Sequence, residues 1–242
     1  MLLANLRARL RSQRVEAQRQ AKSRRFYSQF VGKNAPVFDL GANVGQRTAI
    51  FASLGARVVA FEPQPTCIEQ LTNRFHGVEN VRIVPKALSS VHGSVSMTIF
   101  EDRALASCSK EWISTTAASG RFDTGPAKGI VEVEAITLDE AIEEFGVPRF
   151  CKIDVEGYEL DVLKGLSSRI EYLSLEFAIE YLDHTKACLD LLKSRGWMIE
   201  VAYSLGESME LSDEGWTQDE PLLASLRSLP PLAWGDIYVH LQ

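Results

Sequence analysis

The chain of 242 residues lacks the features of disulfide-bonded, metal-binding and membrane-spanning proteins. Its four cysteines, at positions 67, 108, 151 and 188, lie far apart, with neither a CxxC pair nor the spacing of a zinc site. We interpret them as reduced thiols and expect a cytoplasmic protein. No apolar run approaches the roughly 20 residues that a membrane helix needs. Residues 1–7 also lack the continuous apolar core of a secretory signal.

Basic charge is scarce outside the start of the chain. The net charge is −6, yet residues 1–25 hold eight Arg or Lys against one acid, Glu16, so the remaining residues carry −13. This negative charge on the rest of the chain repels a phosphate backbone, and we therefore expect no nucleic-acid partner. The fractions of hydrophobic residues (45%) and charged residues (24%) are ordinary for a globular protein. The length suits one large α/β domain.

The basic start, residues 1–34, is predicted to form a helical N-terminal arm. Leu3, Leu6 and Leu10 share one helical stripe, and Arg occupies the other positions. One interpretation is an arm that contacts an anionic membrane surface or a partner, or that directs import into an organelle. The alternative is a solvated helix that packs Leu3, Leu6 and Phe26 on the domain, or a frayed start of the chain, because charge runs usually mark a surface.

Residues 35–242 are predicted to form one doubly wound α/β domain, because strands and helices alternate along the chain. The expected strands cover residues 37–40, 57–61, 81–84, 94–100, 131–136, 150–154, 172–177, 197–202 and 236–241, and the expected helices residues 46–54, 66–75, 137–145, 159–166 and 186–194. The strands at 94–100 and 131–136 alternate at period two and are expected to pair antiparallel around a long loop. We interpret that loop, residues 101–130, as an inserted lid. Residues 204–232 form an acidic, irregular insertion with a short helix at 222–229.

The turn after the first predicted strand is typical of nucleotide-binding α/β domains. Asp39 precedes Gly41 and Gly45, and a helix follows, so unpaired N–H groups are expected beside a ligand. Glu62 ends the second strand about where an acid usually holds the hydroxyls of a ribose. Asn43 stands where a dinucleotide motif has a glycine, and its side chain crowds a diphosphate. A nucleoside cofactor without phosphates, such as S-adenosylmethionine, therefore suits this turn better.

Acidic residues follow several predicted core strands, at the edge where open α/β sheets bind ligands. They are Asp39, Glu62, Asp154 and Glu176. The alternative is that such acids cap the helices that follow, and we prefer this interpretation for Asp139. The Asp-x-Glu-Gly sequence at Asp154 also makes a good helix entry, so both interpretations stay open there.

These motifs together resemble the FkbM family of S-adenosylmethionine-dependent methyltransferases. The matching blocks are Val37–Gly45, Ala60–Pro63, Asn80–Val81, Ala87–Ser89, Thr137–Asp139, Lys152–Glu159 and Leu163–Gly165. They cover roughly residues 35–200 in the family's order, and the Lys-Ile-Asp-Val-Glu-Gly block is the most specific of them. The arm and residues 204–232 lie outside the resemblance.

The resemblance implies a Rossmann-like, seven-stranded class I methyltransferase sheet, mostly parallel with an antiparallel last strand. It implies methyl transfer to a hydroxyl of a saccharide, a glycolipid or a natural product, hence a small-molecule or glycan acceptor. Carried over by position, the residues that hold the methionine part of the cofactor are Asp39, Gly41, Asn43 and Gly45. Glu62 is implied to hold the ribose, Ala87 within Lys86-Ala87-Leu88 to lie beside the adenine, and Asp154 to lie near the transferred methyl group.

An alcohol must lose its proton during attack on the methyl group, which requires a general base or a metal ion. No histidine lies in the matching blocks, so carboxylates are left for this role. We hypothesise that Asp154 is the base or a ligand of a divalent metal, with Glu156 and Glu176 in the same cavity. Lys152 is expected to hold a carboxylate or the acceptor. The alternative for Lys152 and Glu156 is a structural ion pair at the strand end.

Trp112 and the turn Ser107-Cys108-Ser109 fall in the predicted lid. An aromatic face there suits a sugar ring. The alternative is that Trp112 only anchors the loop.

Three other functions stay open from the sequence. They are an N-methyltransferase of the same fold, a NAD-dependent sugar-modifying enzyme, which Asn43 disfavours, and a cofactor-binding scaffold without catalysis. The sequence assigns neither the acceptor, nor a metal, nor the oligomeric state.

Overall fold

The computed structural model describes residues 2–102, 105–122 and 125–242. Its helices are α1 (Leu2–Tyr27), α2 (Gln46–Ser53), α3 (Pro65–Arg74), α4 (Lys110–Ser119), α5 (Leu138–Phe145), α6 (Glu159–Lys164), the 3-10 helix η2 (Ile179–Tyr181), α7 (Leu182–Ser194) and α8 (Asp219–Arg227). Its strands are β1 (Pro36–Leu40), β2 (Arg57–Phe61), β3 (Val81–Val84), β4 (Ala87–Leu88), β5 (Gly93–Ile99), β6 (Gly129–Ile136), β7 (Phe150–Ile153), β8 (Tyr172–Ala178), β9 (Ile199–Leu205) and β10 (Trp234–Leu241). Each strand and helix that the sequence predicts is present, with bounds that differ by a few residues.

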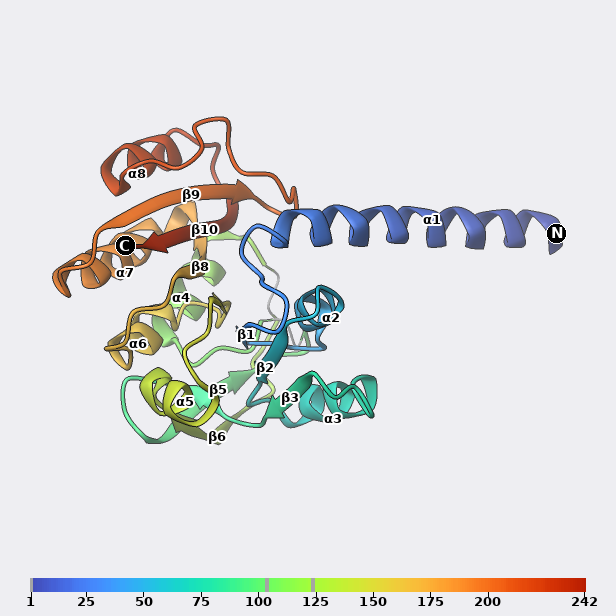
Figure 1. Ribbon diagram of the computed structural model, residues 1–242, viewed down its shortest axis with the longest axis horizontal. Helices are drawn as coiled ribbons and strands as arrows, with labels where there is room; N and C mark the ends of the chain where they lie inside the picture. Colours follow the sequence, from blue (N-terminus) through green and yellow to red (C-terminus); the bar gives the residue numbers. More distant parts are fainter. Residues whose placement is uncertain (1, 103–104, 123–124) are drawn as a thin grey trace.

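Seven strands form the central sheet, in the order β3-β2-β1-β7-β8-β10-β9 (Figure 1). Neighbouring strands in the part β3-β2-β1-β7-β8 pair in parallel, as expected where helices connect consecutive strands. The last strand, β10, inserts between β8 and β9 and is antiparallel to both. The mostly parallel sheet with an antiparallel last strand is therefore confirmed.

Apolar side chains cover both faces of this sheet. On one face, α5, α6, α7 and α8 bury Leu40, Ile153 and Leu175 in the larger core. On the other face, the end of α1 and helix α2 pack against Phe150 and Tyr238. Burial on both sides explains why the parallel strands read as nearly continuous apolar runs in the sequence.

A second sheet of three strands, in the order β4-β6-β5, lies beside the main sheet. β5 and β6 pair antiparallel, as predicted. The segment between them contains α4, where the sequence predicts a loop, and Ser109 caps this helix by accepting a hydrogen bond from the Trp112 N–H. Residues 103–104 and 123–124 of the predicted lid, like residue 1 of the predicted arm, lie outside the described residues.

Two predicted helix signals have different outcomes. Thr137 caps α5, and Glu140 completes the capping box, as the spacing predicts. Asp139 caps no helix. Its carboxylate accepts hydrogen bonds from the backbone N–H groups of Ser167 and Ser168, and so holds the turn that follows α6.

The predicted arm divides into two parts. Most of α1 projects away from the sheet, with the N-terminus at its far end (Figure 1). The last turn of α1 does not project, because Phe26 and Tyr27 are buried in the core together with Phe30 and Val31. The core therefore begins before residue 35, where the sequence predicts the domain to start.

Candidate active site

The register of the sheet brings the predicted acids to one edge. Leu40 pairs with Phe61 on one side and with Ile153 on the other, and Ile153 pairs with Leu175. The residues that follow these partners, Gly41, Glu62, Asp154 and Glu176, therefore begin the same edge of the sheet. Asp236 of β10 pairs with Glu176 and extends the row. Asp39 lies two positions before Gly41, in the row of Lys152, and so sits below this edge.

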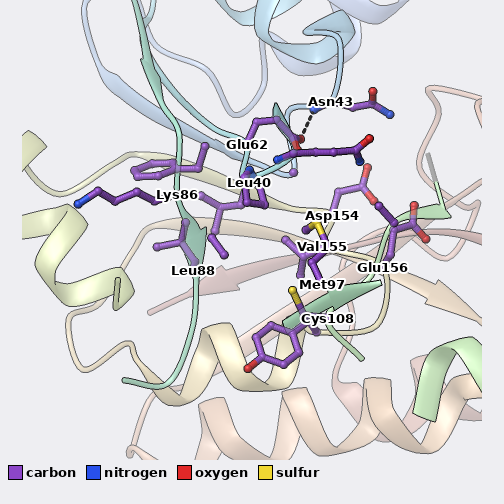
Figure 2. Close-up of a pocket in the computed structure, with 17 residues that line it drawn as sticks. Leu40, Asn43, Glu62, Lys86, Leu88, Met97, Cys108, Asp154, Val155 and Glu156 are labelled. Atoms are coloured by element: carbon purple, nitrogen blue, oxygen red, sulfur yellow. Dashed lines mark hydrogen bonds between the residues drawn. The ribbon is translucent and has the colours of Figure 1, made fainter. Parts of the chain in front are cut away.

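A pocket opens at this edge, and most of the predicted cofactor residues line it. Its lining comprises Leu40, Gly41, Asn43, Phe61, Glu62, Pro63, Gln64, Lys86, Ala87, Leu88, Met97, Ala106, Cys108, Asp154, Val155, Glu156 and Tyr158. Asp154 and Glu156 lie at one end of the pocket, and Lys86 and Leu88 lie at the other (Figure 2). The enclosed volume is about 100 Å³, so a nucleoside-sized ligand must extend into the open mouth or displace lining side chains.

Both glycines of the turn have left-handed backbone, with φ of 77° at Gly41 and 78° at Gly45. Contacts within the protein require glycine at both positions, even without a ligand. A Cβ at Gly41 would lie 1.8 Å from the carbonyl oxygen of Asp154, and one at Gly45 would lie 2.4 Å from the ring of Phe75. Gly45 does not line the pocket, so its effect on a ligand is indirect, through the shape of the turn. Asn43 also has left-handed backbone, with φ of 50°.

Glu62 is fixed by the backbone around it. Its carboxylate accepts a hydrogen bond of 2.8 Å from the N–H of Asn43 (Figure 2) and another of 2.8 Å from the N–H of Gln64. Burial raises the pKa of Glu62 to about 7, although these two hydrogen bonds act in the opposite direction. The side chain therefore faces the glycine turn, and its protonation state changes near neutral pH.

Asp39 is buried behind the turn rather than in the pocket. Its carboxylate accepts a hydrogen bond of 2.5 Å from the hydroxyl of Thr48, which ties β1 to α2. Burial raises the pKa of Asp39 above its usual value, and the bond from Thr48 acts against that rise. Its predicted contact with the methionine part of a cofactor stays a prediction.

Three carboxyl groups gather where Asp154 and Glu156 line the pocket, although Glu176 itself does not line it. Asp154, Glu156 and Glu176 each place one oxygen within 4.8 Å of the others, as predicted from their positions after β7 and on β8. Burial, followed by repulsion from the neighbouring carboxylates, raises the pKa of Glu156 and of Glu176 well above the usual value. The group therefore suits a bound cation or a shared proton.

Lys152 pairs with Asp154 rather than with Glu156, contrary to the ion pair considered from the sequence. Its ammonium lies 2.7 Å from Asp154 and 3.8 Å from Asp236. Burial alone would lower the pKa of Lys152, but the two carboxylates outweigh it and hold the pKa well above its usual value. The lysine is 3% exposed and holds the carboxylate of Asp154, while its contact with an acceptor stays a prediction.

The loop that carries Asp154 and Glu156 is held from both sides. Glu159 is buried and accepts hydrogen bonds from the N–H groups of Val155 and Gly157. From the inserted segment, the hydroxyl of Ser107 donates to the carbonyl of Glu156 over 2.6 Å. Trp112 is 4% exposed and packs on the same loop, so its ring anchors α4 and offers no face to a sugar.

The sequence left Met97 and Tyr158 without a role, although both line the pocket. Tyr158 lies within the most specific block, and its hydroxyl is 3.2 Å from that of Ser89. Its place directly after the Asp-Val-Glu-Gly turn is a signal that could have identified it. Met97 carries no such signal, because β5 belongs to the second sheet and its approach to the pocket depends on tertiary packing.

Comparisons with known proteins bear on the family. The family described as "Methyltransferase FkbM domain" matches residues 39–196. The chain is 33% identical over 146 residues to the hexuronic acid methyltransferase AglP of Haloferax volcanii, in a match that covers 59% of this chain and 54% of that protein. It is 29% identical over 165 residues to the methyltransferase sdnD of Sordaria araneosa, covering 55% of this chain and 61% of that protein. The chain thus spans little more than half the length of these curated relatives.

Solved methyltransferase structures are similar in backbone only. For the precorrin-6y C5,15-methyltransferase of Geobacter metallireducens, the TM-score is 0.46 at 13% identity, covering 94% of this chain and 87% of that one. For the fibrillarin of Aeropyrum pernix, solved with natively bound S-adenosylmethionine, the TM-score is 0.44 at 10% identity, covering 87% of this chain and 68% of that one.

Among the described residues, no helix combines the length and the apolar composition that a membrane crossing requires.

Proposed function

The chain belongs to the FkbM family of methyltransferases, and we propose that it transfers the methyl group of S-adenosylmethionine to a hydroxyl oxygen of a saccharide or a natural product. The acceptor class is supported by the name of AglP, which is a hexuronic acid methyltransferase. The observation that carries the proposal is the charge of the pocket. Three carboxyl groups, Glu62, Asp154 and Glu156, line it together with a single lysine, Lys86.

This charge fits a cationic nucleoside and opposes a diphosphate. Lys86 forms an ion pair of 2.5 Å with Glu134, so it offers no free charge to a phosphate. In our proposal, Glu62 accepts hydrogen bonds from the ribose hydroxyls, and Ala87 lies beside the adenine. Bound S-adenosylmethionine supplies an electrophilic methyl group on a sulfonium centre. Asp154, with a side chain 35% exposed, faces the end of the pocket at which we place that centre.

Asp154 is our proposed general base. Lys152 donates to one of its oxygens over 2.7 Å, and the other oxygen makes no hydrogen bond within the described part of the chain. That second oxygen can accept the proton of an acceptor hydroxyl while Lys152 holds the carboxylate in place. Glu156 and Glu176, with their raised pKa values, can donate hydrogen bonds to the acceptor from the same side.

The test is turnover by the Asp154→Asn variant. We expect the variant to bind S-adenosylmethionine normally in calorimetry and to lose at least about a hundredfold in the rate at which S-adenosylhomocysteine forms. Saccharides that carry hexuronic acids serve as acceptors in this assay. Asp161→Asn, in α6, is the matched control and should keep its activity, because Asp161 pairs with Lys164 outside the pocket. Full turnover by Asp154→Asn would remove the assignment.

Two further measurements separate the alternatives. Product mass and the position of the new methyl group distinguish transfer to oxygen from transfer to nitrogen. Binding of NAD in place of S-adenosylmethionine would point to a different enzyme class. Turnover that stops in the presence of a chelator and returns on addition of Mg²⁺ would assign the activation of the hydroxyl to a cation held at Asp154, Glu156 and Glu176. Unchanged turnover in the presence of a chelator supports Asp154 as the general base.

A further inference from the structure

A second cavity of about 420 Å³ lies between α1 and α2, apart from the pocket described above. It is lined by Glu16, Arg19, Gln20, Ser23, Arg24, Gln46, Arg47, Ala49, Ile50, Ser53 and Arg74. Its α1 residues belong to the part of that helix near the domain, from which the rest of α1 projects (Figure 1). Four arginines and one acid line this groove, although the chain beyond residue 25 carries a net charge of −13.

Three of the four arginines have partners within the protein. Arg47 places its guanidinium 2.6 Å from Glu207, and Arg19 approaches the same carboxylate at 3.4 Å. Arg74 donates a hydrogen bond of 2.8 Å to the carbonyl of Val44. The one acid of the groove, Glu16, accepts a hydrogen bond of 3.0 Å from Gln20.

Arg24 is the exception. Across residues 2–102, 105–122 and 125–242, its guanidinium makes no hydrogen bond, ion pair or ring contact. The side chain is half-buried, and its neighbour Ser23, which also lines the groove, is buried. A partly desolvated guanidinium without an acceptor is unfavourable, and a bound anion would supply that acceptor.

We propose that the groove between α1 and α2 binds a phosphate group, with Arg24 as its principal contact. The planar guanidinium matches the oxygens of a phosphate, and the neighbouring arginines strengthen the positive potential of the groove. Farther along α1, the exposed residues Arg11 and Arg14 add positive charge beyond the groove. The phosphate can come from the head group of an anionic lipid or from a soluble phosphate ester, and both have the same chemistry at Arg24.

The test compares two adjacent arginines in the full chain. Inorganic phosphate is titrated into the parent protein, Arg24→Gln and Arg25→Gln, at constant ionic strength with chloride as the control anion. Arg25 is exposed and does not line the groove, so it controls for the loss of one charge from the same helix. We expect Arg24→Gln to weaken phosphate binding at least about tenfold and Arg25→Gln to change it less than about twofold. Equal weakening in both variants would show charge screening only and would overturn the proposal.

A second arm of the experiment separates the two sources. Sedimentation is measured with vesicles of phosphatidylcholine, alone or mixed with phosphatidylglycerol. Binding to the mixed vesicles alone, lost in Arg24→Gln and kept in Arg25→Gln, assigns the groove to a lipid head group. Phosphate binding without vesicle binding assigns it to a soluble phosphate ester. Absence of both kinds of binding overturns the proposal. None of these readouts depends on methyl transfer, so they fail or succeed independently of the proposed activity.

Discussion

At the scale of single residues, Glu62 makes the folded state sensitive to pH. Burial raises its pKa from 4.5 to about 7, so the folded chain binds this proton more tightly than the unfolded chain does. The resulting stabilisation is fully present below pH 4.5 and is lost as the pH rises through about 7. The difference between the pKa of Glu62 in the folded chain and in the unfolded chain corresponds to about 3 kcal/mol. We expect the free energy of unfolding, from urea titrations, to fall by up to that amount more in the parent than in Glu62→Gln between about pH 5 and pH 8. Glu69→Gln, an exposed control on α3, should lose as much free energy of unfolding over this pH range as the parent does.

The same carboxylate should make cofactor affinity rise with pH. In our proposal, only the ionised form of Glu62 accepts two hydrogen bonds from ribose hydroxyls in addition to those from Asn43 and Gln64. We expect the affinity for S-adenosylmethionine to weaken by up to about tenfold for each pH unit below about 7. Glu62→Gln should bind weakly at every pH. Calorimetry at about pH 6 and pH 8 measures both. A parent affinity that does not change with pH would show that Glu62 does not contact the ligand.

The side chains at the strand ends were predictable from the sequence, and their pairing was not. Glu62, Asp154 and Glu176 each follow an apolar run, and parallel strands end at one edge, so their proximity follows from the pattern alone. Lys152 was expected to hold a carboxylate or the acceptor, with an ion pair to Glu156 as the alternative. Side chains alternate along a strand, so Lys152 and Asp154 share a face, and Glu156 lies past the strand with φ of 52°. The contribution of Asp236 depends on β10 entering beside β8, which no local pattern indicates.

At the scale of elements, α4 depends on a glycine in the acidic loop. Gly157 has φ of 84°, and a Cβ there would lie 2.3 Å from the Cβ of Trp112. Gly157→Ala should therefore displace α4 from the loop, cost about 2–4 kcal/mol in thermal or urea unfolding, and lower turnover. Gly196→Ala is the matched control, because Gly196 has φ of 79° and open space around it. It should cost only the backbone strain, about 1 kcal/mol. Equal costs would show that Trp112 yields to the new side chain.

Elements with a strong hydrophobic period were predictable, and α4 lacked one. Its residues, Lys110–Ser119, are largely Ser, Thr and Ala around Trp112 and Ile113, which is a composition typical of a loop. The helix is fixed by the cap at Ser109 and by the packing of Trp112 with Phe100 and Leu105. The cap is local, whereas Trp112 also packs against Gly157 and Tyr181, which are distant in the sequence. Tertiary packing therefore decides the state of this segment, and local propensity does not.

At the scale of the whole molecule, the projecting helix and the domain meet in an aromatic cluster. Phe30 is 1% exposed, and its ring lies 4.9 Å from that of Tyr238 and 5.4 Å from that of Phe150. The sequence assigns residues 1–34 to an arm because their charge dominates the pattern, and the apolar residues near Phe26 are too few to indicate a core. The buried core of the domain thus includes Phe26, Tyr27, Phe30 and Val31.

This boundary predicts two opposite outcomes for two changes in the same predicted arm. Val15→Ser changes a residue of the projecting part of α1 that is 57% exposed and belongs to no buried core, so the urea midpoint should stay within error of the parent. Phe30→Ala should lower the free energy of unfolding by about 3–5 kcal/mol, because it leaves a cavity between two rings of the sheet. Gln29→Ala, at an exposed neighbouring position, should change it by less than about 1 kcal/mol. If a chain that lacks residues 1–34 unfolded cooperatively at the parent midpoint, the core would begin at β1 and the cluster around Phe30 would contribute nothing to stability.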